Sequence, residues 1–108
     1  MKADSLKDFV LDQLRGLGGL ECRAMFGGFG LYAGGKFFGI IFKGRLYFKT
    51  NAKSRPDYVK RGMSPFIYKK GRQIVSLNYF EVPPDVLENR DALVAWAERA
   101  IQLRAAKK

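Results

Sequence analysis

Apolar residues near the N-terminus recur at the spacing of an amphipathic helix. Over residues 4–16 the pattern places one stripe of hydrocarbon along a helix, formed by Leu6, Phe9, Val10, Leu14 and Leu17. Asp4 has a side chain suited to capping the first turn, and glycines at 16, 18 and 19 end the helix. Asp8 and Asp12 lie on the opposite face, where they fit either a solvated surface, which the pattern favours, or a carboxylate site.

Two short turns organise residues 22–50 into a predicted meander of three or four antiparallel strands. Gly34-Gly35 and Lys43-Gly44 both suit hairpin turns whose central residues take positive φ. Two-residue turns at both places pair Tyr32 with Phe37, Gly30 with Gly39, Gly39 with Phe48, and Ile41 with Leu46. The face predicted to pack under the helices therefore carries Tyr32, Phe37, Ile41, Leu46 and Phe48.

The other face of this predicted sheet mixes large apolar side chains with basic ones. Its members are Leu31, Phe38, Ile40, Phe42, Arg45, Tyr47 and Lys49. A sheet face with this much hydrocarbon usually meets another surface. Three covers fit it, namely the rest of this chain, a second copy in a homodimer, or a partner protein, and the pattern favours the chain itself.

The second half of the chain is predicted to supply a hairpin between helices. Residues 52–61 form a short basic helix with Pro56 in its first turn, and Gly62 ends it. Residues 66–70 and 73–82 form a hairpin about Lys70-Gly71, with register pairs Ile67–Ile74 and Phe66–Val75. Pro83-Pro84 then ends the sheet, since proline donates no ladder hydrogen bond.

A final helix closes the predicted fold. One helical turn is expected at residues 85–88, and Asn89 caps a helix that runs to about residue 104. Its buried stripe is Leu93, Trp96, Ala97, Ala100 and Ile101, with Trp96 expected to be fully buried. The whole is an α+β fold in one domain, residues 1–108, with an antiparallel meander sheet of about five to six strands flanked by N-terminal, short central and C-terminal helices.

Composition narrows the chemistry that the chain can perform. The 108 residues contain no histidine and one cysteine, Cys22, which removes imidazole catalysis, histidine zinc sites and any intrachain disulfide. The chain is therefore predicted not to be an enzyme and to hold no cofactor or metal, with a carboxylate or metal enzyme as the outside alternative. Without a signal pattern or an apolar run near the roughly 18 residues of a membrane span, we expect a cytoplasmic protein with no membrane contact.

Positive charge is concentrated in the middle of the chain. The net charge is +10, and residues 36–72 hold eleven Lys and Arg against Asp57 alone, while the flanking thirds are balanced. Such a segment attracts polyanions, although it also serves solubility. The predicted partner or nucleic-acid contacts are Lys43, Arg45, Lys49, Lys53, Arg55, Lys60, Arg61, Lys69, Lys70 and Arg72.

Three local motifs each have a functional and an ordinary interpretation. The glycine-rich Met25–Gly30 stretch fits a phosphate cradle, but a strand follows it rather than a helix, which favours a bend between strands. Cys22 beside Arg23 is a candidate reactive thiol, and an incidental cysteine is favoured. The alternation from Arg45 to Lys49 resembles a surface that stacks single-stranded bases, and an ordinary half-buried strand is favoured.

These motifs, in this order and spacing, resemble a known family. The segments are Met25–Tyr32, Gly44–Lys49, Gly62 with Pro65–Tyr68, and Tyr79–Pro83, and the likeness covers about residues 5–103. They resemble the N-terminal domain of the TfoX/Sxy family. The resemblance implies an α+β domain and a role in bacterial natural competence, where family members act as transcriptional coactivators with the cyclic-AMP receptor protein. Full-length family regulators carry a second domain, so we expect this chain to be a stand-alone first domain.

Two hypotheses about function follow from these observations. The first is a non-enzymatic regulatory module that contacts a protein partner of the transcription machinery. The second is direct, largely sequence-independent nucleic-acid binding by the basic segment 36–72. A homodimer remains a candidate assembly for either.

Overall fold

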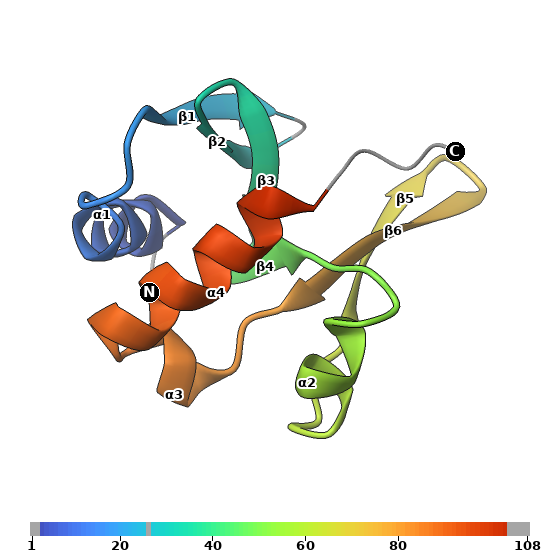
Figure 1. Ribbon diagram of the computed structural model, residues 1–108. Helices are drawn as coiled ribbons and strands as arrows, with labels where there is room; N and C mark the ends of the chain where they lie inside the picture. Colours follow the sequence, from blue (N-terminus) through green and yellow to red (C-terminus); the bar gives the residue numbers. More distant parts are fainter. Residues whose placement is uncertain (1–2, 26, 104–108) are drawn as a thin grey trace.

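The predicted α+β fold is confirmed. A computed structural model describes residues 3–25 and 27–103, without the side chains of residues 3, 4, 68, 70 and 73–77, and shows four helices and a six-stranded antiparallel sheet in this part of the chain (Figure 1). The elements are α1 (Ala3–Gln13), β1 (Leu20–Met25), β2 (Gly28–Ala33), β3 (Lys36–Phe42), β4 (Arg45–Lys49), α2 (Arg55–Val59), β5 (Pro65–Lys70), β6 (Gln73–Glu81), α3 (Pro84–Leu87) and α4 (Arg90–Gln102).

The sheet is a meander with one rearrangement. The strand order is β1-β2-β3-β4-β6-β5, so the last hairpin joins the sheet through its second strand and leaves β5 at the edge. The two predicted turns are confirmed, because Gly34 and Gly35 have φ of 58° and 82°, and Lys43 and Gly44 have φ of 50° and 75°. Positive φ at both central positions matches the right-handed twist of the flanking strands.

The predicted turn of the β5–β6 hairpin is wrong by one residue, and the predicted pairing of its strands is therefore wrong by two residues. Lys70 pairs with Gln73 and Lys69 with Ile74, so the turn is Gly71-Arg72 rather than Lys70-Gly71. Gly71, with φ of 61°, occupies the first central position of the turn. Pairing therefore shifts along the hairpin, and Ile67 opposes Ser76.

A β-bulge overturns part of the predicted face assignment. Tyr32 pairs with Phe37 as predicted, but Gly30 pairs with Ile40 instead of Gly39, because Phe38 is an extra residue in β3. An extra residue reverses the face of every side chain on one side of it. The sheet faces predicted for Tyr32, Phe37, Leu31 and Phe38 are wrong for this reason. Leu31 and Phe38 lie instead in the core under the helices.

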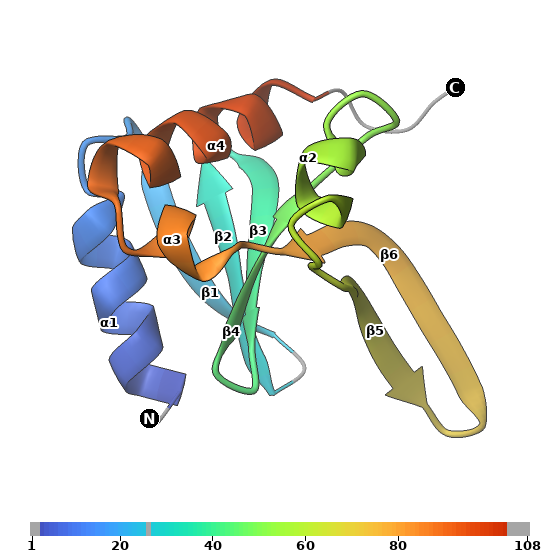
Figure 2. The ribbon, with the colours of Figure 1, turned by 90° about the horizontal axis from the view of Figure 1, so that it is seen from below.

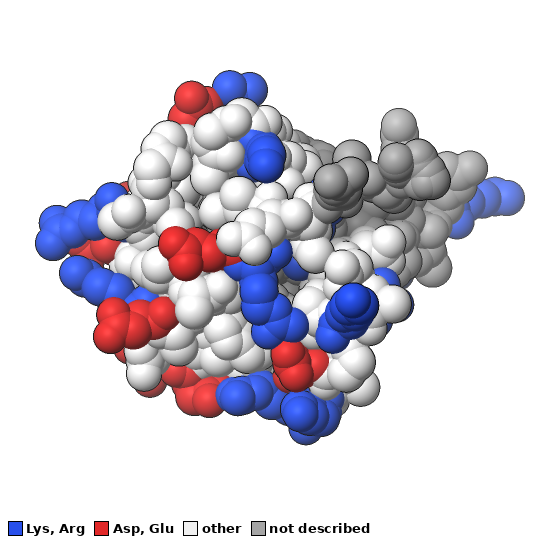
Figure 3. Space-filling model, in the orientation of Figure 1, with Lys and Arg blue, Asp and Glu red and all other residues white. Residues whose placement is uncertain are grey.

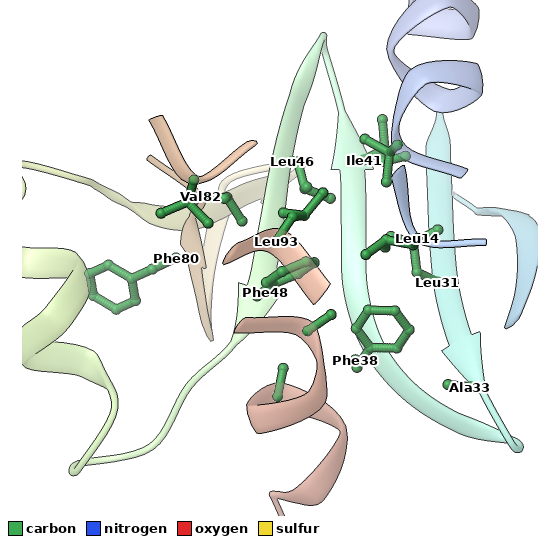
Figure 4. Packing of buried hydrophobic residues seen from close by; sticks show 14 of the residues in the cluster. Leu14, Leu31, Ala33, Phe38, Ile41, Leu46, Phe48, Phe80, Val82 and Leu93 are labelled. Atoms are coloured by element: carbon green, nitrogen blue, oxygen red, sulfur yellow. The ribbon is translucent and has the colours of Figure 1, made fainter. Parts of the chain in front are cut away.

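Three helices cover one face of the sheet and bury the main core (Figures 2 and 4). Leu14, directly after α1, and Leu93 of α4 meet Phe38 and Phe48 of the sheet, and all four side chains are 0% exposed. The Phe38 and Phe48 ring centroids lie 5.7 Å apart. Small side chains on α4, at Ala97 and Ala100, let the helix approach the sheet closely.

Two aromatic residues predicted for the core lie at its margin. Phe9 is 40% exposed because α1 packs through Leu6 and Val10, in line with Leu14 directly after the helix. Trp96 is half-buried between α4 and α2, where its ring lies 4.8 Å from Tyr58 in an edge-on contact. Neither ring is therefore at the centre of the helix–sheet interface.

The helix ends follow local hydrogen bonding. The helix α1 begins at Ala3, so Asp4 lies inside the first turn rather than at the predicted cap, and α1 ends at Gln13 instead of 16. The predicted helix over residues 52–61 begins three residues later, because α2 begins at Arg55. The Asn51 side chain accepts hydrogen bonds from the amides of Lys53 and Ser54 and holds these residues in a turn before the helix. The predicted cap of α4 is confirmed, because Asn89 Oδ1 accepts from the amide of Ala92 at 3.0 Å.

The second face of the sheet is covered in part by the chain itself, as favoured above. Phe66 of β5 is 0% exposed and makes edge-on ring contacts with Phe42 at 5.5 Å and Tyr47 at 5.0 Å. Ile40 and Tyr79 are buried in the same small cluster. Within the described part of the chain, no helix is long and apolar enough to cross a membrane.

Candidate functional site

The ten predicted contact residues do not form one surface. Three are held in ion pairs, namely Arg45 with Glu81 at 3.1 Å, Lys60 with Asp57 at 3.8 Å and Arg61 with Asp85 at 2.7 Å. The side chain of Lys70 lies outside the described residues. Figure 3 shows the same intermixing of acidic and basic side chains across the face that carries α4.

Six of the ten form no ion pair with any residue that the structure describes, and they occupy three places. Lys43 lies in the β3–β4 turn, Lys69 and Arg72 lie at the end of the β5–β6 hairpin, and the remaining three follow the end of β4 into α2, at Lys49, Lys53 and Arg55. Arg55 reaches β6, where its guanidinium donates to Asn78 Oδ1 at 3.4 Å. The basic segment is therefore divided among separate surfaces.

One of these places borders a groove of about 550 Å³ at the end of the sheet. Its lining residues come from β3, β4, β6 and the end of α4, and they are Lys36, Phe37, Lys49, Tyr79, Ile101, Gln102 and Leu103. Pairing of β4 with β6 sets Lys49 beside Tyr79, and the ring of Phe37 lies 5.4 Å from that of Tyr79. The groove thus combines two cations with an apolar wall.

The two lysines of this groove, Lys36 and Lys49, have no carboxylate partner in the described part of the chain. Burial raises the pKa of the Tyr79 phenol, and the neighbouring Tyr32 raises it further, so this phenol stays neutral at physiological pH. Two ammonium groups beside rings and aliphatic side chains suit a ligand that is both acidic and apolar.

Sequence reasoning identified Lys49 but missed the groove. Lys36 directly follows the Gly34-Gly35 turn within the basic segment, a position that could have drawn attention to it. Phe37 was assigned to the opposite face because the bulge at Phe38 has no clear sequence signal. The contribution of α4 depends on tertiary packing, which strand and helix periodicity do not specify.

The glycine-rich stretch is a hairpin turn, which confirms the favoured interpretation. Met25 ends β1, Gly28 begins β2, and Gly27 between them has φ of 82°. A methyl group on Gly28 would overlap the carbonyl oxygen of Ile41 in β3. Glycine is needed here so that β2 and β3 can approach each other, and no helix follows that would complete a phosphate site.

The remaining motifs also have structural roles. Asp12 pairs with Arg90 at 3.2 Å and links α1 to α4, and the described residues contain no group of three acidic or cysteine side chains placed to hold a metal. Burial raises the pKa of the Cys22 thiol while Lys7 lowers it, and Arg23, expected to favour the thiolate, pairs with Glu21 at 2.8 Å.

The alternating strand from Arg45 to Lys49 is an ordinary half-buried strand, as favoured. Leu46 and Phe48 enter the main core, and the ring of Tyr47 is engaged by Phe66. The ring of Tyr47 is thus partly buried within the sheet's second face.

The protein is a small α+β domain, in which helices cover one face of an open antiparallel sheet. Its most distinctive surface feature is the basic and aromatic groove at the end of the sheet. The chain belongs to the family described as the TfoX N-terminal domain, which matches residues 12–103. The sequence resemblance to this family is thereby confirmed.

Two curated relatives have informative names. The chain is 30% identical over 98 residues to the "DNA transformation protein TfoX1" of Aliivibrio fischeri, covering 90% of this chain and 46% of the relative. It is 30% identical over 103 residues to "Protein Sxy" of Escherichia coli, covering 94% of this chain and 49% of the relative. The chain therefore spans about half the length of these relatives.

Proposed function

We propose that this protein is a non-enzymatic regulatory module that acts in the control of DNA transformation by contacting a protein of the transcription machinery. The observation that carries the proposal is the groove at the end of the sheet, where Lys36 and Lys49 lie beside Phe37 and the apolar end of α4. Support for the process comes from the name of the relative TfoX1 and from the shared family domain.

The chemistry of the groove favours a protein segment that presents carboxylates next to an apolar side chain. The two lysines attract the carboxylates, and Phe37, Ile101 and Leu103 offer the apolar side chain a surface away from water.

A role in binding a partner also agrees with the residue types that the chain contains. Without histidine, the usual general base at neutral pH is missing, and the single cysteine has a raised pKa that disfavours its nucleophilic thiolate. Binding through a preformed groove needs neither group.

Photocrosslinking inside the cell tests this proposal. A benzophenone amino acid replaces Phe37 in the groove, and the same replacement at the exposed Phe9 on α1 is the matched control. We expect the probe at Phe37 to crosslink a component of the transcription machinery, and the double variant Lys36→Gln/Lys49→Gln to reduce the yield at least several-fold. Identical products from both positions, or products without any transcription component, would refute the proposal.

A further inference from the structure

The β5–β6 hairpin extends beyond the sheet as an arm. Strand β4 pairs with β6 only from Tyr79 to Glu81, and the amide of Thr50, directly after β4, donates to the carbonyl oxygen of Asn78 at 2.7 Å. The four residues 73–76 of β6 pair with β5 alone, and at about 3.4 Å per residue this part is about 14 Å long. Figures 1 and 2 show the hairpin pointing away from the helices and from the rest of the sheet.

The arm is exclusively basic in its charged residues. The sequence from Tyr58 to Phe80 contains no Asp or Glu but five Lys and Arg, three of them at the end of the arm, at 69, 70 and 72. Lys69 and Arg72 are exposed and form no ion pair with the described residues. Gly71 at the tip has no neighbour that an added Cβ would meet within 4 Å, so the turn is open.

Packing at the base of the arm holds it in place. Phe66 is fully buried against Phe42 and Tyr47, whereas its neighbour Ile67 is 51% exposed. A bulge between Pro65 and Ile67 bends the strand at this anchor. An arm fixed at its base loses less conformational freedom when its tip binds a partner.

We propose that the β5–β6 hairpin is a DNA-binding arm that enters the major groove of double-stranded DNA. The major groove is about 12 Å wide and about 8.5 Å deep and admits a two-stranded β-ribbon, whereas the minor groove is only about 6 Å wide. Entry of the arm brings its tip between the two phosphate backbones that border the groove, where the long side chains of Lys69 and Arg72 reach phosphates. Contacts of this kind position a protein on DNA without reading its sequence.

The fit of a two-stranded ribbon to the major groove favours a duplex. Single-strand binding depends on bases stacking on aromatic rings, and none of the described exposed side chains of the hairpin, Ile67, Lys69, Arg72 and Asn78, is aromatic, while the side chain of Tyr68 lies outside the described residues. This narrows the predicted nucleic-acid contact from the whole segment 36–72 to one element. The arm is separate from the groove, so the protein would bind DNA and a protein partner through different surfaces.

Fluorescence anisotropy with a 25-base-pair duplex of arbitrary sequence, measured over a salt series, tests the proposal. The double variant Lys69→Gln/Arg72→Gln removes two charges from the arm, and Lys36→Gln/Lys49→Gln removes two from the groove as the matched control. Each lost phosphate contact lowers the slope of log K against log salt by about 0.9. We therefore expect the arm variant to have a slope shallower by about 1.8 and, at 0.1 M salt, an affinity lower by about 60-fold.

The control variant should bind the duplex within a few-fold of the unsubstituted protein, and a 25-nucleotide single strand should compete more weakly than the duplex. Equal losses of DNA affinity in the two variants would show that only the diffuse charge of the protein attracts DNA. That result would overturn the proposal that the hairpin is a DNA-binding arm. Equal competition by the single strand, or no binding at low salt, would overturn it as well. The crosslink at position 37 reports on the groove independently, so the two proposals can fail separately.

Discussion

Substituting Gly28 by alanine tests whether the glycine-rich stretch serves strand packing. The added methyl group would overlap the Ile41 carbonyl oxygen and lie 3.2 Å from Cδ1 of Phe42. The φ of Gly28 is not in the positive range, so the effect is purely steric. Overpacking of this kind costs typically 1–3 kcal/mol, and because backbone rather than a flexible side chain must move, we expect a loss of about 3 kcal/mol.

Two other glycines provide matched controls for this substitution. Gly18 has neither a positive φ nor a neighbour within 4 Å, so Gly18→Ala should leave stability unchanged or raise it by up to about 1 kcal/mol. Gly35 has open space but a φ of 82°, so Gly35→Ala should cost about 1–2 kcal/mol through backbone strain alone.

Urea unfolding followed by circular dichroism measures the three free energies. For a domain of about 100 residues a loss of about 3 kcal/mol also lowers Tm by roughly 15 °C. If Gly28→Ala unfolds at the same urea concentration as Gly18→Ala, the close approach of β2 and β3 is not what requires glycine at this position.

Two further predictions concern aromatic side chains. Trp96→Ala should lower the free energy of unfolding by about 2 kcal/mol, measured by thermal unfolding, because Trp96 is only half-buried against Tyr58. A fully buried tryptophan would cost roughly 3–5 kcal/mol. A loss above about 4 kcal/mol would contradict the position of Trp96 at the margin of the core. Burial raises the pKa of the Tyr58 and Tyr79 phenols above the ordinary 10.0, so their contribution to stability is complete below pH 10 and falls as pH rises through the folded-state values. Absorbance titration at 295 nm should show two phenols that ionise only above the others or on unfolding, and five phenols that titrate together near pH 10 would contradict this.

Much of the fold could be predicted because local signals agree with it. The Gly34-Gly35 and Lys43-Gly44 turns fix two hairpins, and Asn89 fixes the start of α4. These features depend on the φ values that a residue tolerates and on hydrogen bonds between near neighbours, both of which a sequence displays directly.

The parts that could not be predicted depend on contacts between distant residues. The bulge at Phe38 places a large ring in the core and moves Phe37 to the groove, and the run from Phe37 to Phe42 is apolar on both faces, so alternation carries no information there. Likewise, β5 contacts β3 through Phe66 and Phe42 because the sheet curls. The predicted basic surface was divided for a similar reason, since pairing with Glu81 and Asp85 comes from residues far along the chain.

The link between the first and last long helices has a consequence for biosynthesis. Asp12 bonds Arg90, Gln13 donates to the carbonyl oxygen of Leu87 at 3.2 Å, and Leu14 and Leu93 share one core. A ribosome adds about 5–20 residues per second, so several seconds separate the appearance of these partners. Throughout that interval Phe38 and Phe48 lack the cover that α4 supplies, and the nascent chain completes its core only after α4 has been synthesised.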